Sequence, residues 1–183
     1  MTMTSSTPAL MIRGGSLLRS WRGTSTRTYG VHPAAVFLFE LLVRRRLQIH
    51  LVGLLLMFWG YMQYRLCGAY LMKRGEGSGF GAFSWGIGGP RHESMRNPER
   101  LITTGPYTLT RNPMYMGHAI FTAGLALATR SPFAILLCIY HGWYLHQRAL
   151  QDEQALSQRF GEEYARYRER TPLWLPGLPA FRG

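Results

Sequence analysis

Apolar residues along the chain gather in runs that short polar or basic segments separate. The longest run, residues 47–72, contains a single charged side chain, Arg65. A helix rises about 1.5 Å per residue, so this run is long enough to cross a lipid bilayer. Residues 33–43 are also apolar, but Glu40 interrupts them and they are too short to cross. We expect residues 47–72 to form a membrane span and residues 33–43 an interfacial or partly inserted helix.

A helical hairpin is predicted in the second half of the chain. Residues 114–128 and 132–147 are two apolar runs, separated only by a polar segment that ends in Pro132. A turn this short between two helical runs places the helices side by side and antiparallel. We therefore expect an antiparallel pair of helices here.

Residues 148–170 are polar but carry an apolar stripe with helical spacing. The stripe consists of Leu156, Phe160, Tyr164 and Tyr167. This spacing predicts an amphipathic helix that Pro172 and Pro176 would end. No segment alternates as a strand would. The predicted fold class is all-α: a polytopic membrane helical bundle with a helical hairpin and a C-terminal amphipathic helix.

The composition supports a lipid environment. Hydrophobic residues make up 46% of the chain and charged residues 16%, against about a quarter charged in soluble domains. The net charge is +12, and basic residues flank the apolar runs, as in Arg44–Arg46 and Lys73-Arg74. Positive charge at the ends of apolar runs is typical of membrane proteins. No basic-aromatic motif accompanies it, so we expect no nucleic-acid partner. Cys67 and Cys138 have no metal-binding spacing, and no metal site is predicted.

Residues 1–30 have the composition of an organellar transit peptide. They contain several arginines, many serines and threonines, and no acidic residue; the first carboxylate is Glu40. Arg27-Thr28-Tyr29 also resembles a processing site. A disordered basic leader, or a wrongly chosen start codon, would give the same composition. We predict a leader over residues 1–30, a membrane domain over residues 31–183, and the mitochondrial inner membrane as the compartment that such a leader favours.

The sequence Arg111-Asn112-Pro113 marks the start of a helix with anion-binding character. Asn is a favoured N-cap and Pro a favoured first helical residue. The free amides and the positive dipole end lie there, and Arg111 adds a full charge, so the site can hold a carboxylate or phosphate. An ordinary capped membrane helix with an interfacial arginine has the same pattern.

Asp152 and Glu153 fall on or beside the inward stripe of the last helix. Two carboxylates that face a core are unfavourable unless a cation meets them. We expect Arg111, a histidine or a positively charged ligand to do so. A helix start that binds anions and a pair of inward carboxylates could together hold a zwitterion such as an amino-acid moiety.

Residues 101–117 resemble a known signature: Gly-Pro-Tyr, followed by Arg-His-Pro-x-Tyr-x-Gly. It is the signature of the isoprenylcysteine carboxyl methyltransferases and phospholipid methyltransferases. The block from Asp152 to Pro176 is similar to the family's carboxyl-terminal block. Two positions depart from the pattern, because Asn112 stands in place of the histidine and Asp152 in place of the first of two glutamates.

The resemblance implies a helical membrane fold that binds S-adenosylmethionine and receives a lipophilic methyl acceptor from the membrane lipid. By motif match, Arg111 and Glu153 are the catalytic candidates. The residues expected to border the cofactor are Tyr107, Arg111, Asn112, Pro113, Tyr115, Gly117, Asp152 and Glu153. Asp152 and Glu153 would anchor the amino group of the cofactor.

Two alternatives remain beside a membrane methyltransferase. A sterol-reductase-like enzyme would have a similar helical architecture but use NADPH; the acidic pair argues against it, because phosphates bind cations. The second is a non-catalytic accessory subunit, bound to other subunits of an organellar membrane complex.

Overall fold

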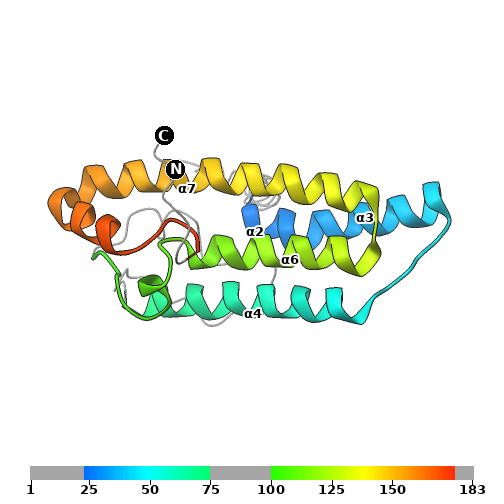
Figure 1. Ribbon diagram of the computed structural model, residues 1–183, viewed down its shortest axis with the longest axis horizontal. Coiled ribbons are helices and arrows are strands. Elements are labelled where there is room, and N and C mark those ends of the chain that lie inside the picture. Colours follow the sequence, from blue (N-terminus) through cyan, green and yellow to red (C-terminus); the bar gives the residue numbers. More distant parts are fainter. Residues whose placement is uncertain (1–22, 75–99, 176–183) are drawn as a thin grey trace, which may run out of the picture.

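The computed structural model describes residues 23–74 and 100–175, and within these ranges the protein has helices and no strand (Figure 1). The predicted all-α class is confirmed. The first helical segment consists of α2 (Thr24–Thr26), the π-helical turn η1 (Arg27–Val31), α3 (His32–Phe39) and the π-helical turn η2 (Glu40–Arg44). There follow α4 (Leu51–Arg74), a 3-10 turn η3 (Gly105–Thr108), α6 (Pro113–Thr129) and α7 (Pro132–Arg170).

Glycines allow α4 and α6 to lie unusually close together. A Cβ atom built on Gly117 would lie 2.7 Å from the carbonyl oxygen of Gly60, and one on Gly124 would lie 2.8 Å from that of Gly53. Such contacts are shorter than any side chain tolerates, so only glycine fits at this interface. Small residues serve the same purpose where membrane helices pack. Gly117 is therefore a packing residue between α6 and α4.

The predicted hairpin is confirmed as α6 and α7. Arg130 adopts the left-handed conformation (φ 46°) that ends α6. The Ser131 side chain then accepts a hydrogen bond from the backbone N–H of Ala134 and caps α7, with Pro132 in its first turn. The turn therefore follows from local sequence alone.

Residues 148–170 continue α7 and do not form a separate helix. The helix is interrupted at Gly161, whose backbone (φ 49°, ψ −121°) lies outside the helical region. In Figure 1 the chain reverses direction in the orange part of α7, and the red part that follows runs back toward the bundle. The predicted stripe is divided by this reversal: Tyr164 and Tyr167 are buried, whereas Leu156 and Phe160 are half-buried.

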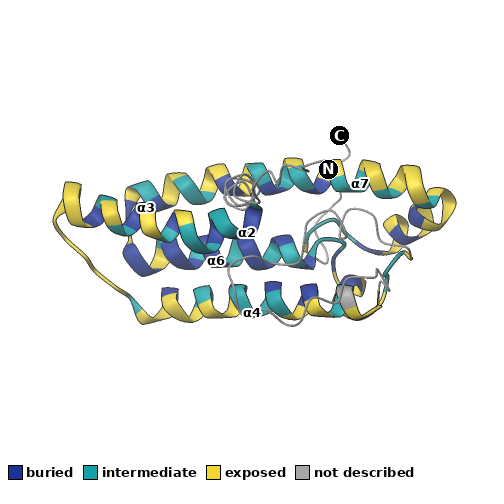
Figure 2. Ribbon diagram, turned by 180° about the vertical axis from the view of Figure 1, so that it is seen from behind, coloured by how far each residue is buried: buried dark blue, intermediate teal, exposed yellow. Residues whose placement is uncertain are grey.

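The first helical segment buries several polar side chains beside Val36 and exposes several apolar ones (Figure 2). Thr28 is 0% exposed, while Leu42 is 67% exposed. Glu40 is buried and pairs with Arg44 at 3.1 Å. The helix extends from residue 24 to 44, beyond the predicted 33–43, and the predicted boundary between a leader and the membrane domain falls inside it. Residues 1–22 of the predicted leader lie outside the described residues.

Within residues 23–74 and 100–175, no helix has both the length and the apolar character required for a membrane crossing. The helix predicted over residues 47–72 is present as α4 and begins at Leu51. Its predicted crossing is not supported, because Gln63 and Arg65 interrupt its apolar sequence.

Candidate functional site

Arg111 and Glu153 meet at the end of the bundle where α6 begins and α7 turns back. Arg111 precedes α6, and its Nε donates a hydrogen bond of 2.6 Å to Oε1 of Glu153 in α7. The two side chains are largely buried, at 6% and 13% exposure. We expected a cation to meet the inward carboxylates. For Glu153 that cation is Arg111. The two residues are 42 positions apart in the sequence, so the ion pair depends on the tertiary fold.

Arg111 also holds the segment that follows the reversal of α7. Its Nη1 donates to the carbonyl oxygens of Arg168 at 3.0 Å and of Thr171 at 2.7 Å. The planar guanidinium presents several donors in a fixed arrangement and so can bind three acceptors at once. Arg111 therefore joins the parts of α7 on the two sides of Gly161.

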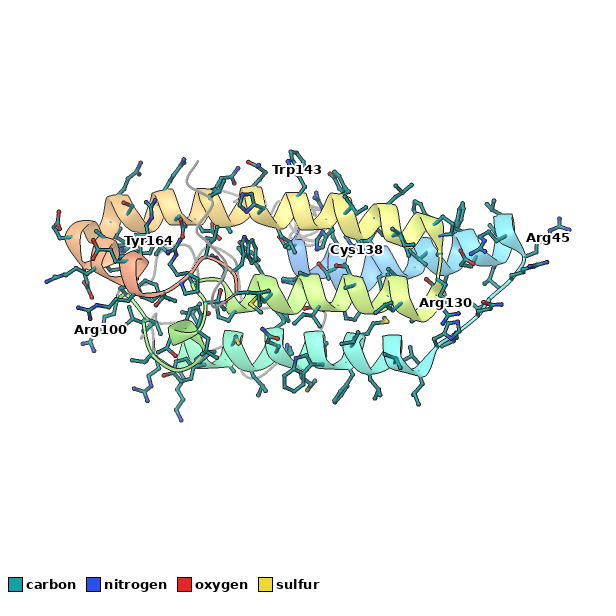
Figure 3. All side chains as sticks on the ribbon, viewed as in Figure 1. Arg45, Arg100, Arg130, Cys138, Trp143 and Tyr164 are labelled. Atoms are coloured by element: carbon teal, nitrogen blue, oxygen red, sulfur yellow. The ribbon has the colours of Figure 1, made fainter. Side chains whose placement is uncertain are left out.

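A tyrosine hydroxyl binds each of the two carboxylates. Tyr115, in α6, donates to Oδ2 of Asp152 at 2.5 Å, and Tyr164 donates to Oε1 of Glu153 at 3.1 Å. Burial raises the pKa of Tyr164 above its ordinary value, and the Glu153 carboxylate raises it further. Tyr164 is therefore a neutral donor; Figure 3 shows it at the end of the bundle where α7 turns back.

The other predicted site residues lie in η3 and in the first turns of α6, and their contacts differ. Tyr107 is buried in η3, and its carbonyl oxygen accepts a 2.7 Å hydrogen bond from Tyr167. Burial raises the pKa of the Tyr107 hydroxyl, which stays protonated. Pro113 begins α6, and its carbonyl oxygen accepts from Gln63 of α4 at 3.2 Å. Gly117 lies against α4, on the packing interface described above.

Asn112 occupies the N-cap position of α6, but its side chain does not cap the helix. Its Nδ2 instead donates to the carbonyl oxygen of Leu173 at 3.4 Å. The predicted side-chain cap is thus wrong. The chain after α7 passes over this helix start, and the Leu173 carbonyl oxygen holds the Asn112 amide through its Nδ2.

Residues 171–174, here called the strap, also belong to the site, although the sequence analysis did not predict this. The backbone N–H of Arg111 donates to Pro172 O, and Thr110 Oγ1 donates to Leu173 O, both at 2.9 Å. Trp174 Nε1 donates to His146 Nδ1 at 3.2 Å. Pro172 signalled only the end of a helix in the sequence. No local pattern indicates that residues 171–174 cover the start of α6.

Comparison with known proteins finds relatives for part of the chain. Residues 79–163 match the phospholipid methyltransferase family. The nickel-cobalt-cadmium resistance protein NccN of Alcaligenes xylosoxydans xylosoxydans is 32% identical over 90 residues, which are 49% of this chain and 42% of that protein. Protein-S-isoprenylcysteine O-methyltransferase of Schizosaccharomyces pombe is 32% identical over 88 residues, 47% of this chain and 37% of its own. The Homo sapiens protein of the same description is 31% identical over 84 residues, 45% and 28%.

These matches confirm the resemblance to the family, and the family match over residues 79–163 includes Arg111, Asp152 and Glu153. The chain spans about two-fifths or less of the length of the curated relatives it matches. No solved structure matches it.

Proposed function

We propose that this chain is a membrane methyltransferase that takes its methyl group from S-adenosylmethionine. Its acceptor is a lipid or a lipidated carboxylate or amine. The match of residues 79–163 to the phospholipid methyltransferase family supports this proposal. One observation carries the proposal: the two motif blocks come together in space, through Tyr115 with Asp152 and Arg111 with Glu153.

The residues of the site fit the cofactor. S-adenosylmethionine carries an ammonium and a sulfonium, and the site holds two partly buried carboxylates that are neighbours in the sequence. Carboxylates pair with an ammonium, and the phenol rings of Tyr107, Tyr115 and Tyr164 can contact a cation. We assign Asp152 and Glu153 to the amino group of the cofactor, with Tyr115 holding Asp152 in place.

Arg111 takes a different role from the one that the motif alone implies. Its hydrogen bonds go to Glu153 and to the carbonyl oxygens of Arg168 and Thr171. We therefore propose that Arg111 is a positioning residue that holds Glu153, and that it does not bind the cofactor carboxylate. Glu153 is the residue that contacts the cofactor.

Methyl transfer requires alignment of the donor and the acceptor more than acid-base chemistry. The bound cofactor supplies an electrophilic methyl group on sulfur. The protein holds that group in line with the acceptor and excludes water, which can supply a large share of the rate enhancement. Arg111 fixes Glu153, and the strap covers the start of α6. An amine acceptor must also lose a proton before it reacts.

The surface supports a membrane setting for this chemistry. Large apolar side chains are exposed on several helices, among them Leu42, Phe58, Trp59, Leu136 and Trp143. Figure 3 shows Trp143 projecting outward from α7. Exposed apolar faces around a partly polar interior suit a lipid environment, and the acceptor would then enter from the lipid. From the arginine-rich, acid-free composition of residues 1–30 we also propose an organellar membrane, with the mitochondrial inner membrane as the candidate.

Calorimetry on the full chain in detergent tests the proposal. S-adenosylmethionine should bind, and Glu153→Ala should abolish binding because the ammonium loses its partner. Glu163→Ala is the matched control, because Glu163 is exposed on the far side of Gly161. Absence of binding to the unaltered protein would refute the proposal. Binding without methyl transfer to membrane lipids would favour the accessory-subunit alternative.

A further inference from the structure

Arg148, in α7, is a second arginine beside the carboxylate pair, and the proposed function gives it no task. It lies one helical turn before Asp152, and residues four apart occupy the same face of a helix. Leu145 and Ala149, which flank it in the sequence, are buried in one cluster with Tyr115 of α6. The Arg148 side chain therefore starts from the side of α7 that faces α6.

One buried nitrogen of the Arg148 guanidinium is left without a partner among the described residues. This nitrogen is Nε, whereas Nη1 donates to Oε1 of Gln151 at 3.2 Å. Buried donors in folded proteins are almost always hydrogen-bonded, by the protein, by water or by a bound group. Arg111, in contrast, uses its Nε for Glu153 and its Nη1 for two carbonyl oxygens. Of these two arginines, Arg148 is the one with a buried donor left for a ligand.

The hydroxyl of Tyr115 brings Arg148 and Asp152 together. Tyr115 donates to Oδ2 of Asp152. Burial raises the pKa of Tyr115 and the Asp152 carboxylate raises it further, while the Arg148 guanidinium opposes both because it lies near the same hydroxyl. Side chains one turn apart in a helix have Cβ atoms about 5–6 Å from each other. A positive and a negative side chain thus border one neutral hydroxyl, close enough to bind opposite charges of one small group.

An α-amino acid group matches this arrangement of charges. Its ammonium and its carboxylate are attached to the same carbon, so their partners in a protein must also be neighbours. A carboxylate side chain binds the ammonium, and a guanidinium binds the carboxylate, through charge-assisted hydrogen bonds. Leu173 and Trp174 of the strap pack on the cluster that contains Tyr115. This packing limits the access of water and so strengthens both pairs.

We propose that Arg148 binds the carboxylate of the amino-acid group of S-adenosylmethionine, while Asp152 binds its ammonium. This inference rests on the proposed function, which assigns the ammonium of the cofactor but not its carboxylate. It makes Arg148 the residue that selects a ligand with a complete amino-acid group. The two arginines then have separate tasks, because Arg111 holds Glu153 and Arg148 contacts the ligand.

Calorimetry on the full chain in detergent tests this with two ligands, S-adenosylmethionine and its decarboxylated analogue, which keeps the ammonium and the sulfonium. The unaltered protein should bind the analogue about tenfold or more weakly, because a charge-assisted hydrogen bond is lost. Arg148→Gln should weaken binding of S-adenosylmethionine by a similar factor and leave that of the analogue unchanged. Arg148→Lys, which keeps the charge, should restore part of the affinity. Arg159→Gln, at an exposed position of α7, is the control and should change neither affinity.

The pattern across the two ligands distinguishes direct contact from a positioning role. Asp152→Asn should weaken both ligands, because both carry the ammonium. If Arg148 only holds Asp152 in place, Arg148→Gln will also weaken both ligands equally, and this result would overturn the proposal. An unchanged affinity of Arg148→Gln for S-adenosylmethionine would overturn it as well.

The unaltered protein alone separates this inference from the methyltransferase assignment. Equal affinities for S-adenosylmethionine and for the decarboxylated analogue would refute the role of Arg148 and leave the assignment standing. Absence of binding of S-adenosylmethionine would refute the assignment and this inference with it. Neither outcome depends on whether a variant of Arg148 folds.

Discussion

Arg111 organises the site because one guanidinium serves three acceptors on two segments. Lysine keeps the charge but lacks the planar arrangement of donors. We expect Arg111→Lys to lower the free energy of unfolding by about 1–3 kcal/mol, because the carbonyl oxygens of Arg168 and Thr171 lose their donor. Thermal melting in detergent measures this, with Arg166→Lys as an exposed control. An unchanged melting temperature would show that the contacts to Arg168 and Thr171 contribute nothing to stability.

Tyr115 provides a second residue-scale prediction, because its hydroxyl binds Asp152 directly. Tyr115→Phe keeps the ring and its packing but removes the donor. Hydrogen bonds to charged groups contribute about 1.5–3 kcal/mol, so affinity for S-adenosylmethionine should fall about tenfold or more. Tyr140→Phe, at an exposed position of α7, should leave it unchanged. Equal affinities in the two variants would remove Tyr115 from the site.

At the scale of the helices, the close contact of α4 with α6 restricts which residues can replace the glycines of the interface. A Cβ atom on Gly60 would lie 2.5 Å from the backbone N of Phe121 and 2.6 Å from Gly117 O. Gly60→Ala should therefore force the helices apart and destabilise the protein by about 1–3 kcal/mol.

The matched control for this change is Gly142→Ala in α7, where a Cβ would meet nothing within 4 Å. Alanine in a helix interior is favoured over glycine by about 0.5–1 kcal/mol, so the control should be neutral or stabilising. The two melting temperatures should therefore move in opposite directions. Parallel shifts would show that helix propensity, and not close packing, decides the outcome at Gly60.

The reversal of α7 shows where element-scale reasoning from sequence ends. The apolar stripe continues through residues 156–167, and periodicity alone predicts one straight helix. Gly161 has the freedom to adopt φ 49°, but a single glycine is also tolerated within helices. What fixes the reversal is the binding of the Arg168 and Thr171 carbonyl oxygens to Arg111.

For the whole molecule, the exposed apolar faces and the net charge of +12 predict firm attachment to a membrane. In cells that express the chain, an alkaline carbonate wash, which removes proteins held by charge alone, should leave it in the membrane pellet. A peripheral protein of similar charge is the control and should be released. Recovery of this chain in the supernatant would contradict the membrane assignment.

The sequence by itself determined the helices, the hairpin and the two motif blocks, because these depend on residues a few positions apart. It also placed Asp152 and Glu153 inward, since helical periodicity decides which face a residue occupies. Only the tertiary structure decided that Arg111 binds Glu153 and the strap, that Gly117 packs against α4, and that residues 24–30 belong to the bundle. Each of these contacts joins segments distant in sequence, and no local pattern encodes which distant segment supplies the partner.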